Sequence, residues 1–142
     1  MKVLFDVNVV LDLLLNREPF AADAGEVLSM AEEGRVSGFL CATGVTTIHY
    51  VARKTVGTAA SKKRLQKLLG FLHVAKVDAS IIDRALQSTT DDFEDAVAVE
   101  ASAAVSAEAI VTRNLTDFKG ARIRAYTPAE FIATMLRGKS PP

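Results

Sequence analysis

Five short apolar runs, most of them separated by stretches long enough to form one or two helices, are the feature of this sequence that most constrains its fold. The runs are rich in β-branched and aromatic residues, which favours buried strands. Parallel strands need a crossover connection, usually a helix, so the alternation predicts an α/β fold: a three-layer α/β/α sandwich with a mainly parallel central sheet. The runs are KVLF (2–5), SGFLCA (37–42), HVAKVD (73–78), EAIVT (108–112) and IRAY (123–126).

Between these runs, apolar residues recur at helical spacing, and capping residues stand where helices would begin or end. Asn8 is expected to cap the first helix and Pro19 to lie in the first turn of the second. Gly34 should end that second helix with a left-handed residue, and Thr127 and Pro128 should start the last one. The expected helices are 9–16, 19–34, 43–57, 58–72, 79–88, 91–107 and a final helix from 128.

The length and composition of the chain indicate one globular domain. With 142 residues, 49% of them hydrophobic, the chain can bury a core of its own. We expect the domain to cover residues 1–136 and residues 137–142 to form a disordered tail. The 17 basic and 17 acidic residues balance, so no overall field attracts nucleic acid. This argues against a pure nucleic-acid binder, but not against an enzyme that acts on one.

Three features indicate a cytoplasmic protein with no membrane association. The single cysteine, Cys41, cannot form an internal disulfide, which suits a reducing cytoplasm. The apolar N-terminal stretch is interrupted by Asp6 and Asp12 and has no small-residue cleavage site close behind it, unlike a signal peptide. No apolar run reaches the length of a transmembrane helix.

Polar side chains follow two of the expected strands at their carboxyl ends. Asp6 comes directly after the first strand, and Asn114 and Asp117 come shortly after the fourth. In parallel α/β folds these strand ends meet at one edge of the sheet, where sites are usually found. We therefore expect Asp6, Asn114 and Asp117 to lie near one another, although a turn would also favour Asn114 and Asp117.

A second group of acids opens the alanine-rich helix 91–107. Asp92 and Asp95 are three residues apart and share one face of this helix. Asp91 is expected to act as its cap and Glu94 to be a solvated acid that points away from Asp95. Asp95 should lie at the border between core and cleft, beside an apolar stripe that faces the core. The stripe consists of Phe93, Val97, Ala101 and Ala104, and in the first helix Asp12 is expected to face solvent.

Crowded carboxylates at this edge would need a cation. Like charges at short range repel and raise each other's pKa, so Asp6, Asp95 and Asp117 would destabilise the fold if left uncompensated. Mg²⁺ and Mn²⁺ take oxygen ligands and keep several waters, so two or three carboxylates suffice to hold one. The sequence therefore predicts a Mg²⁺ or Mn²⁺ site with these three aspartates as ligands.

Four stretches carry a resemblance that spans nearly the whole chain: LFDVNVVLDLLL, DFEDAVAVEASA, AIVTRNLTDF and YTPAEFI. In this order they resemble the PIN-domain family and, within it, the VapC-type toxin ribonucleases of bacterial toxin–antitoxin pairs. The resemblance implies a PIN-like sandwich and a Mg²⁺- or Mn²⁺-dependent endoribonuclease that cleaves single-stranded RNA. It also implies a homodimer and an antitoxin protein that covers the cleft.

The same resemblance assigns site residues and shows one departure from the family pattern. The family's strand-end aspartate falls on Asp6, and the polar residue two positions later falls on Asn8. Its helix-start aspartate falls on Asp95, and Asp92 is an adjacent candidate that would orient water. Its polar pair after the fourth strand falls on Asn114 and Asp117, which follow Thr112. A glutamate that the family commonly carries after the second strand falls on Thr47, and residues 43–57 contain no acid. This departure implies a single metal ion or weaker metal binding.

Several alternatives stay open. Thr47 also suits a degenerate PIN scaffold that binds RNA or a protein partner without cleavage. A haloacid-dehalogenase-like phosphatase also begins with an aspartate after an apolar strand, but it requires a second aspartate where Asn8 stands. The basic stretch 52–67 is either a solvated helix face or an RNA contact. The apolar faces of 19–34 and 43–57 either pack on the sheet or bind a partner.

Overall fold

A central sheet of five strands organises the computed structural model, which describes residues 1–138. The strand order is β3-β2-β1-β4-β5, and every neighbouring pair is parallel. The predicted α/β/α sandwich is therefore confirmed, with a sheet that is parallel throughout the described chain. The strands are β1 (Lys2–Phe5), β2 (Ser37–Cys41), β3 (His73–Ala75), β4 (Ala109–Val111) and β5 (Ala125–Tyr126).

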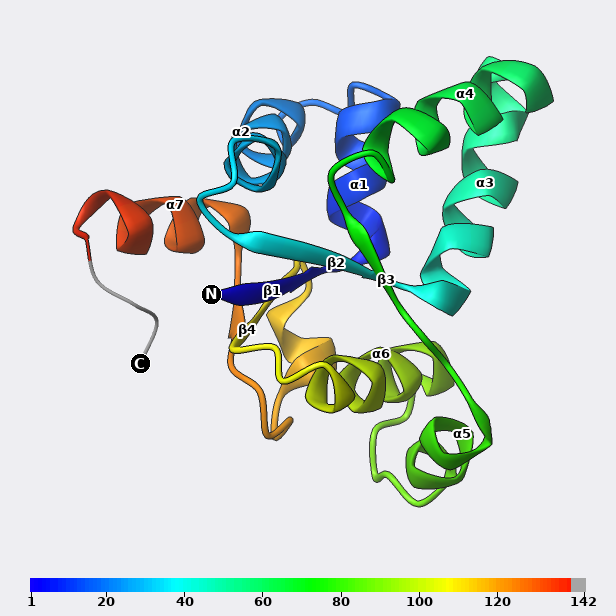
Figure 1. Cartoon of the computed structure of the whole chain (residues 1–142), viewed down its shortest axis with the longest axis vertical. Coiled ribbons are helices and arrows are strands. Elements are labelled where there is room, and N and C mark those ends of the chain that lie inside the picture. Colours follow the sequence, from blue (N-terminus) through cyan, green and yellow to red (C-terminus); the bar gives the residue numbers. More distant parts are fainter. Residues whose placement is uncertain (139–142) are drawn as a thin grey trace.

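Helices cover both faces of this sheet. Figure 1 shows α1, α2, α3, α4 and α7 on one side of the strands and α5 and α6 on the other. The helices are α1 (Val7–Leu14), α2 (Ala21–Glu32), α3 (Ala42–Val56), α4 (Thr58–Leu68), α5 (Ala79–Leu86), α6 (Phe93–Ala104) and α7 (Pro128–Leu136), and a short 3₁₀ helix, η1, spans Leu115–Phe118. None of the helices within residues 1–138 is long and apolar enough to cross a membrane.

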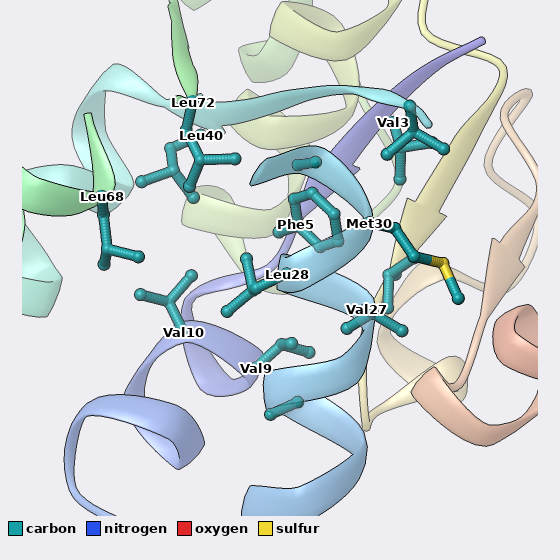
Figure 2. Packing of buried hydrophobic residues seen from close by; sticks show 14 of the residues in the cluster. Val3, Phe5, Val9, Val10, Val27, Leu28, Met30, Leu40, Leu68 and Leu72 are labelled. Atoms are coloured by element: carbon teal, nitrogen blue, oxygen red, sulfur yellow. The ribbon is translucent and has the colours of Figure 1, made fainter. Parts of the chain in front are cut away.

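The central strand β1 has an apolar layer on each side. Because side chains alternate along a strand, Val3 and Phe5 enter the core beneath α1 and α2, while Leu4 enters the core beneath α5 and α6. Figure 2 shows Phe5 packed among Val9, Leu28 and other side chains of the first core. This double burial fixes β1, and with it the position of the residue that follows the strand at the carboxyl edge of the sheet.

The predicted starts of the first two helices are wrong, and the predicted end of the second is confirmed. Asp6, not Asn8, caps α1, because its carboxylate accepts a hydrogen bond from the Val7 N–H and the helix begins at Val7. Pro19 precedes α2, which begins at Ala21. Gly34 follows α2 with a φ of 76°, the left-handed conformation expected of it.

The predicted domain end and tail fall at the end of α7. Thr127 caps this helix and Pro128 opens it, as predicted. Arg137 and Gly138 end the helix, and residues 139–142 of the predicted tail lie outside the described residues.

Candidate active site

Asp6 stands at the carboxyl edge of β1 in a fixed orientation. Its Oδ1 accepts a hydrogen bond from the Val7 N–H at 2.8 Å, and its Oδ2 accepts one from the Thr112 hydroxyl at 2.7 Å. Thr112 is fully buried directly after β4, so the two neighbouring strand ends are joined through this carboxylate. Burial raises the pKa of Asp6, and the two hydrogen bonds lower that pKa in part. The charges of Asp117 and Asp92 raise the pKa of Asp6 further.

The acids of α6 are set by its N-terminal cap. Asp92, not Asp91, is the cap: its Oδ1 accepts a hydrogen bond from the Asp95 N–H at 3.0 Å. Asp95 and Glu94 therefore lie in the first turn of α6, next to the carboxyl edge of the sheet. The predicted apolar stripe is only half correct. Val97 and Ala101 are buried, whereas Phe93 is 46% exposed and Ala104 is exposed.

Glu94 is exposed, as expected of a solvated acid, but it also lies at the site, which was not predicted. Together with Asp6 and Asp95 it lines one hollow, whose walls include Cys41, Thr43 and Gly44 at the junction of β2 and α3. Its Oε2 accepts a hydrogen bond from the Thr47 hydroxyl at 3.2 Å. Helix α6 meets the cleft with its N-terminal end and not with one side, so several positions of its first turn line the cleft.

Crowding at this hollow acts most strongly on Asp95. Its pKa is raised from an ordinary value of 3.8 to about 7, first by burial and then by the charges of Asp6, Asp92, Asp117 and Glu94. The same surroundings raise the pKa of Glu94, mainly through burial, while the Thr47 hydrogen bond lowers it in part. Without a counter-charge, the hollow therefore disfavours the charged form of Asp95 near neutral pH.

This crowding predicts a pH-dependent stability of the metal-free protein. Between about pH 4 and 7 the folded state keeps the Asp95 proton that the unfolded state has lost, so Asp95 lowers stability as the pH rises and to the full extent above pH 7. In chelator, Asp95→Asn is expected to raise Tm clearly at about pH 8 and little at about pH 4.5. The exposed acid Glu108, just before β4 at the opposite edge, supplies the control Glu108→Gln. A lower Tm of Asp95→Asn at pH 8 would show that Asp95 is structural instead.

The remaining predicted residues lie beside this hollow rather than in it. Asp117, in η1, and Asp92 line a neighbouring hollow with Thr89, Thr90 and Lys119. Asn114 is exposed directly before η1, and its backbone N–H donates to the Thr112 hydroxyl oxygen at 3.0 Å. Asp117 is near enough for its charge to act on both Asp6 and Asp95. Within residues 1–138, no three His, Cys, Asp or Glu side chains already stand in an arrangement that would hold a metal ion.

A buried ion pair that was not predicted anchors the chain after β4. Asp12 is 1% exposed, so its predicted solvent position is wrong. Its carboxylate pairs with Arg113 through two hydrogen bonds of 2.6 and 3.1 Å, and the guanidinium lies over the Phe20 ring at 4.1 Å. The Arg113 N–H also donates to the Asn8 side chain at 3.3 Å. An acid inside the apolar run VVLDLLL was the available indication, since a buried charge requires a partner.

A parallel α/β sandwich with carboxylates gathered at the strand ends defines a broad class of proteins whose site lies at the carboxyl edge of the sheet. Within this class the chain belongs to the PIN domain family, because the sequence profile of that family matches residues 2–116. The family resemblance drawn from the sequence is thereby confirmed. No curated protein sequence matches the chain.

Solved structures show the same fold in toxins of toxin–antitoxin systems. A chain of VapBC2 from Rickettsia felis, solved bound to a promoter DNA fragment, aligns with a TM-score of 0.68 and 14% identity over 89% of this chain and 98% of that one. A chain of a toxin–antitoxin complex from Klebsiella pneumoniae aligns with a TM-score of 0.68 and 21% identity, over 89% of this chain and 97% of that one. VapC20 from Mycobacterium tuberculosis, a toxin that cleaves the sarcin–ricin loop, aligns with a TM-score of 0.63 and 11% identity, over 76% of this chain and 86% of that one.

Proposed function

We propose that this protein is a Mg²⁺- or Mn²⁺-dependent endoribonuclease that cleaves single-stranded RNA and acts as the toxin of a toxin–antitoxin pair. The observation that carries the proposal is the meeting of Asp6, Glu94 and Asp95 in one hollow at the carboxyl edge of the sheet. Membership of the PIN domain family and the fold shared with VapC-type toxins support it.

The donor set fits a hard divalent cation. All its groups are carboxylate oxygens, the ligands that Mg²⁺ and Mn²⁺ prefer, and their crowding is the cost that a cation would remove. Asp6, Asp95 and Asp117 are the proposed ligands. Glu94 faces Thr47 and would supply from α6 the carboxylate that residues 43–57 do not offer. When bound, the ion polarises a phosphate oxygen and lowers the pKa of an attacking water.

The surrounding residues hold these carboxylates in place. The Val7 N–H and the Thr112 hydroxyl orient the Asp6 side chain, and each carboxylate oxygen keeps a further lone pair for a ligand. Asp92 positions Asp95 through its cap hydrogen bond, which leaves its other oxygen to orient water. Asn114, exposed directly before η1, would hydrogen-bond to a water in the site.

Binding of Mn²⁺ tests the role of Glu94 without relying on activity. Glu94→Gln is expected to weaken Mn²⁺ binding about tenfold, because it removes a charge from the hollow while keeping the size of the side chain. Isothermal titration calorimetry measures this, with Glu108→Gln at the opposite edge of the sheet as the charge-matched control. Equal weakening by both variants would mean a general charge effect, and unchanged binding would exclude Glu94 from the metal site.

Cleavage of a labelled single-stranded RNA tests the function itself. Chelation should stop cleavage, and added Mg²⁺ or Mn²⁺ should restore it. The alternative is a PIN scaffold that binds RNA or protein without cleaving, and Thr47 at the usual glutamate position favours it. RNA binding without cleavage in either metal would establish that alternative and refute the nuclease.

The proposed partners are an antitoxin and a second copy of the chain. Leu13, Leu14, Leu28 and Phe71 line a hollow between α1, α2 and α4 that also contains charged side chains, and its apolar part suits association. An antitoxin would inhibit by placing an arginine against the carboxylates. Sedimentation at high concentration tests the homodimer, and toxicity on expression with and without a partner gene tests the toxin role. The proposed place of action is the cytoplasm, where RNA is found and the thiol of Cys41 stays reduced.

A further inference from the structure

The acidic and basic residues of this chain are segregated, although their totals balance. All 17 acids lie outside residues 34–77. The helical pair α3–α4 falls within this acid-free stretch, and its basic side chains are all exposed. They are Arg53, Lys54, Lys62, Lys63, Arg64 and Lys67. The acidic cleft is thus flanked by a helical pair of uniformly positive charge.

This basic pair starts at the cleft itself. Thr43 and Gly44 in the first turn of α3 line the hollow that holds Asp6, and Thr47 in the next turn touches Glu94. Figure 1 shows α3 leading away from the end of β2 and α4 returning beside it. Arg53 is six residues beyond Thr47, about 9 Å along the helix axis. This distance is close to the electrostatic screening length at physiological salt, so the charge of Arg53 acts on a nucleic-acid strand that occupies the cleft.

An exposed aromatic ring stands between the cleft and the cations. Tyr50 is 59% exposed and lies three residues after Thr47, so it is the next side chain along that face of α3. The Arg53 guanidinium lies 5.2 Å from the centre of its ring. A ring for stacking with a cation beside it is the combination by which proteins hold single-stranded nucleic acid.

We propose that this face of α3 is the binding surface for the RNA strand next to the cleaved bond: one base stacks on Tyr50, and Arg53 and Lys54 contact the adjoining phosphates. The inference rests on the proposed ribonuclease function and adds how the substrate is held. Single-stranded RNA fits because its bases are free to stack, whereas the bases of a duplex are not. The cations also offset the repulsion between the phosphates and the acidic cleft.

RNA binding in chelator tests this surface while the RNA stays intact. With a labelled single-stranded 12-mer in fluorescence anisotropy, Tyr50→Ala is expected to weaken binding about tenfold, and Tyr50→Phe, which keeps the ring, to change it little. Arg53→Gln should lower the slope of log affinity against log salt by about 0.7, the value for one lost phosphate contact on a single strand. Arg35→Gln, an exposed cation just before β2 at the opposite edge, is the control and should change neither quantity.

The outcomes separate this inference from the proposed function. Wild-type affinity and salt slope in both Tyr50→Ala and Arg53→Gln would overturn the binding surface, even if the protein cleaves RNA. Binding that depends on Tyr50, in a protein that cleaves no RNA in either metal, would keep the surface and refute the nuclease. If an acidic peptide binds with the Arg53 dependence and RNA binds without the Tyr50 dependence, the surface is a protein-binding one and the proposal is wrong.

Discussion

Asp6→Asn is expected to lower kcat/KM for single-stranded RNA by at least about a hundredfold while leaving the fold intact. The asparagine keeps an oxygen that can accept the Val7 N–H, and asparagine caps helices as well as aspartate does. Its amide can meet the Thr112 hydroxyl, which is free to rotate. The change therefore removes the charge from the hollow with little change in shape.

Stability separates loss of function from loss of structure in this variant. Burial and neighbouring acids raise the pKa of Asp6, so the charge destabilises the metal-free protein and its removal should not lower Tm in chelator. Mn²⁺ should raise the Tm of the wild type and not that of Asp6→Asn. Asp23→Asn, an exposed acid in the first turn of α2, is the matched control. Wild-type cleavage by Asp6→Asn would remove the proposed site.

The elements of the fold were predictable because they depend on local sequence. Runs such as KVLF and EAIVT form strands at the predicted positions, and the segments between most of them are long enough for the helical crossovers that parallel strands need. Asp6 was predictable for the same reason, since a residue that follows a central parallel strand lies at the carboxyl edge. Its hydrogen bond with Thr112 joins residues 106 positions apart, yet the sheet order alone brings them together.

The errors concern side chains whose surroundings depend on how elements meet in space. For Glu94, whose side chain is exposed as predicted, the missed feature is its place beside Asp6 and Asp95, because a helical wheel describes directions around an axis but not which neighbour stands at the end of the helix. The proximity of Thr47, on α3, makes Glu94 a cleft residue. Asp12 was placed in solvent because its partner Arg113 is distant in sequence and follows another strand. In both cases the acidic residue could be identified from the sequence, but the residue that it contacts in the folded chain could not.

Breaking the buried pair of Asp12 and Arg113 is expected to produce the largest loss of stability. Arg113→Met should lower the free energy of unfolding by about 3 kcal/mol, because Asp12 would be left charged and buried without its two hydrogen bonds. Denaturant unfolding measures the change. Arg17 also lies 3.8 Å from Asp12, but its side chain is 37% exposed, so Arg17→Met should cost less than about 1 kcal/mol.

A double variant tests whether this loss comes from the unpaired charge or from the packing of Arg113. Asp12→Leu combined with Arg113→Met should recover most of the stability, because replacing a whole buried pair with apolar side chains of similar volume is often neutral. The chain from Thr112 to Asp117 would then keep its position with no charge beneath it, and RNA cleavage should survive. If the double variant is as unstable as Arg113→Met, the loss stems instead from the Arg113 contact with Phe20. If it is stable but inactive, the ion pair itself orients the residues after β4 for catalysis.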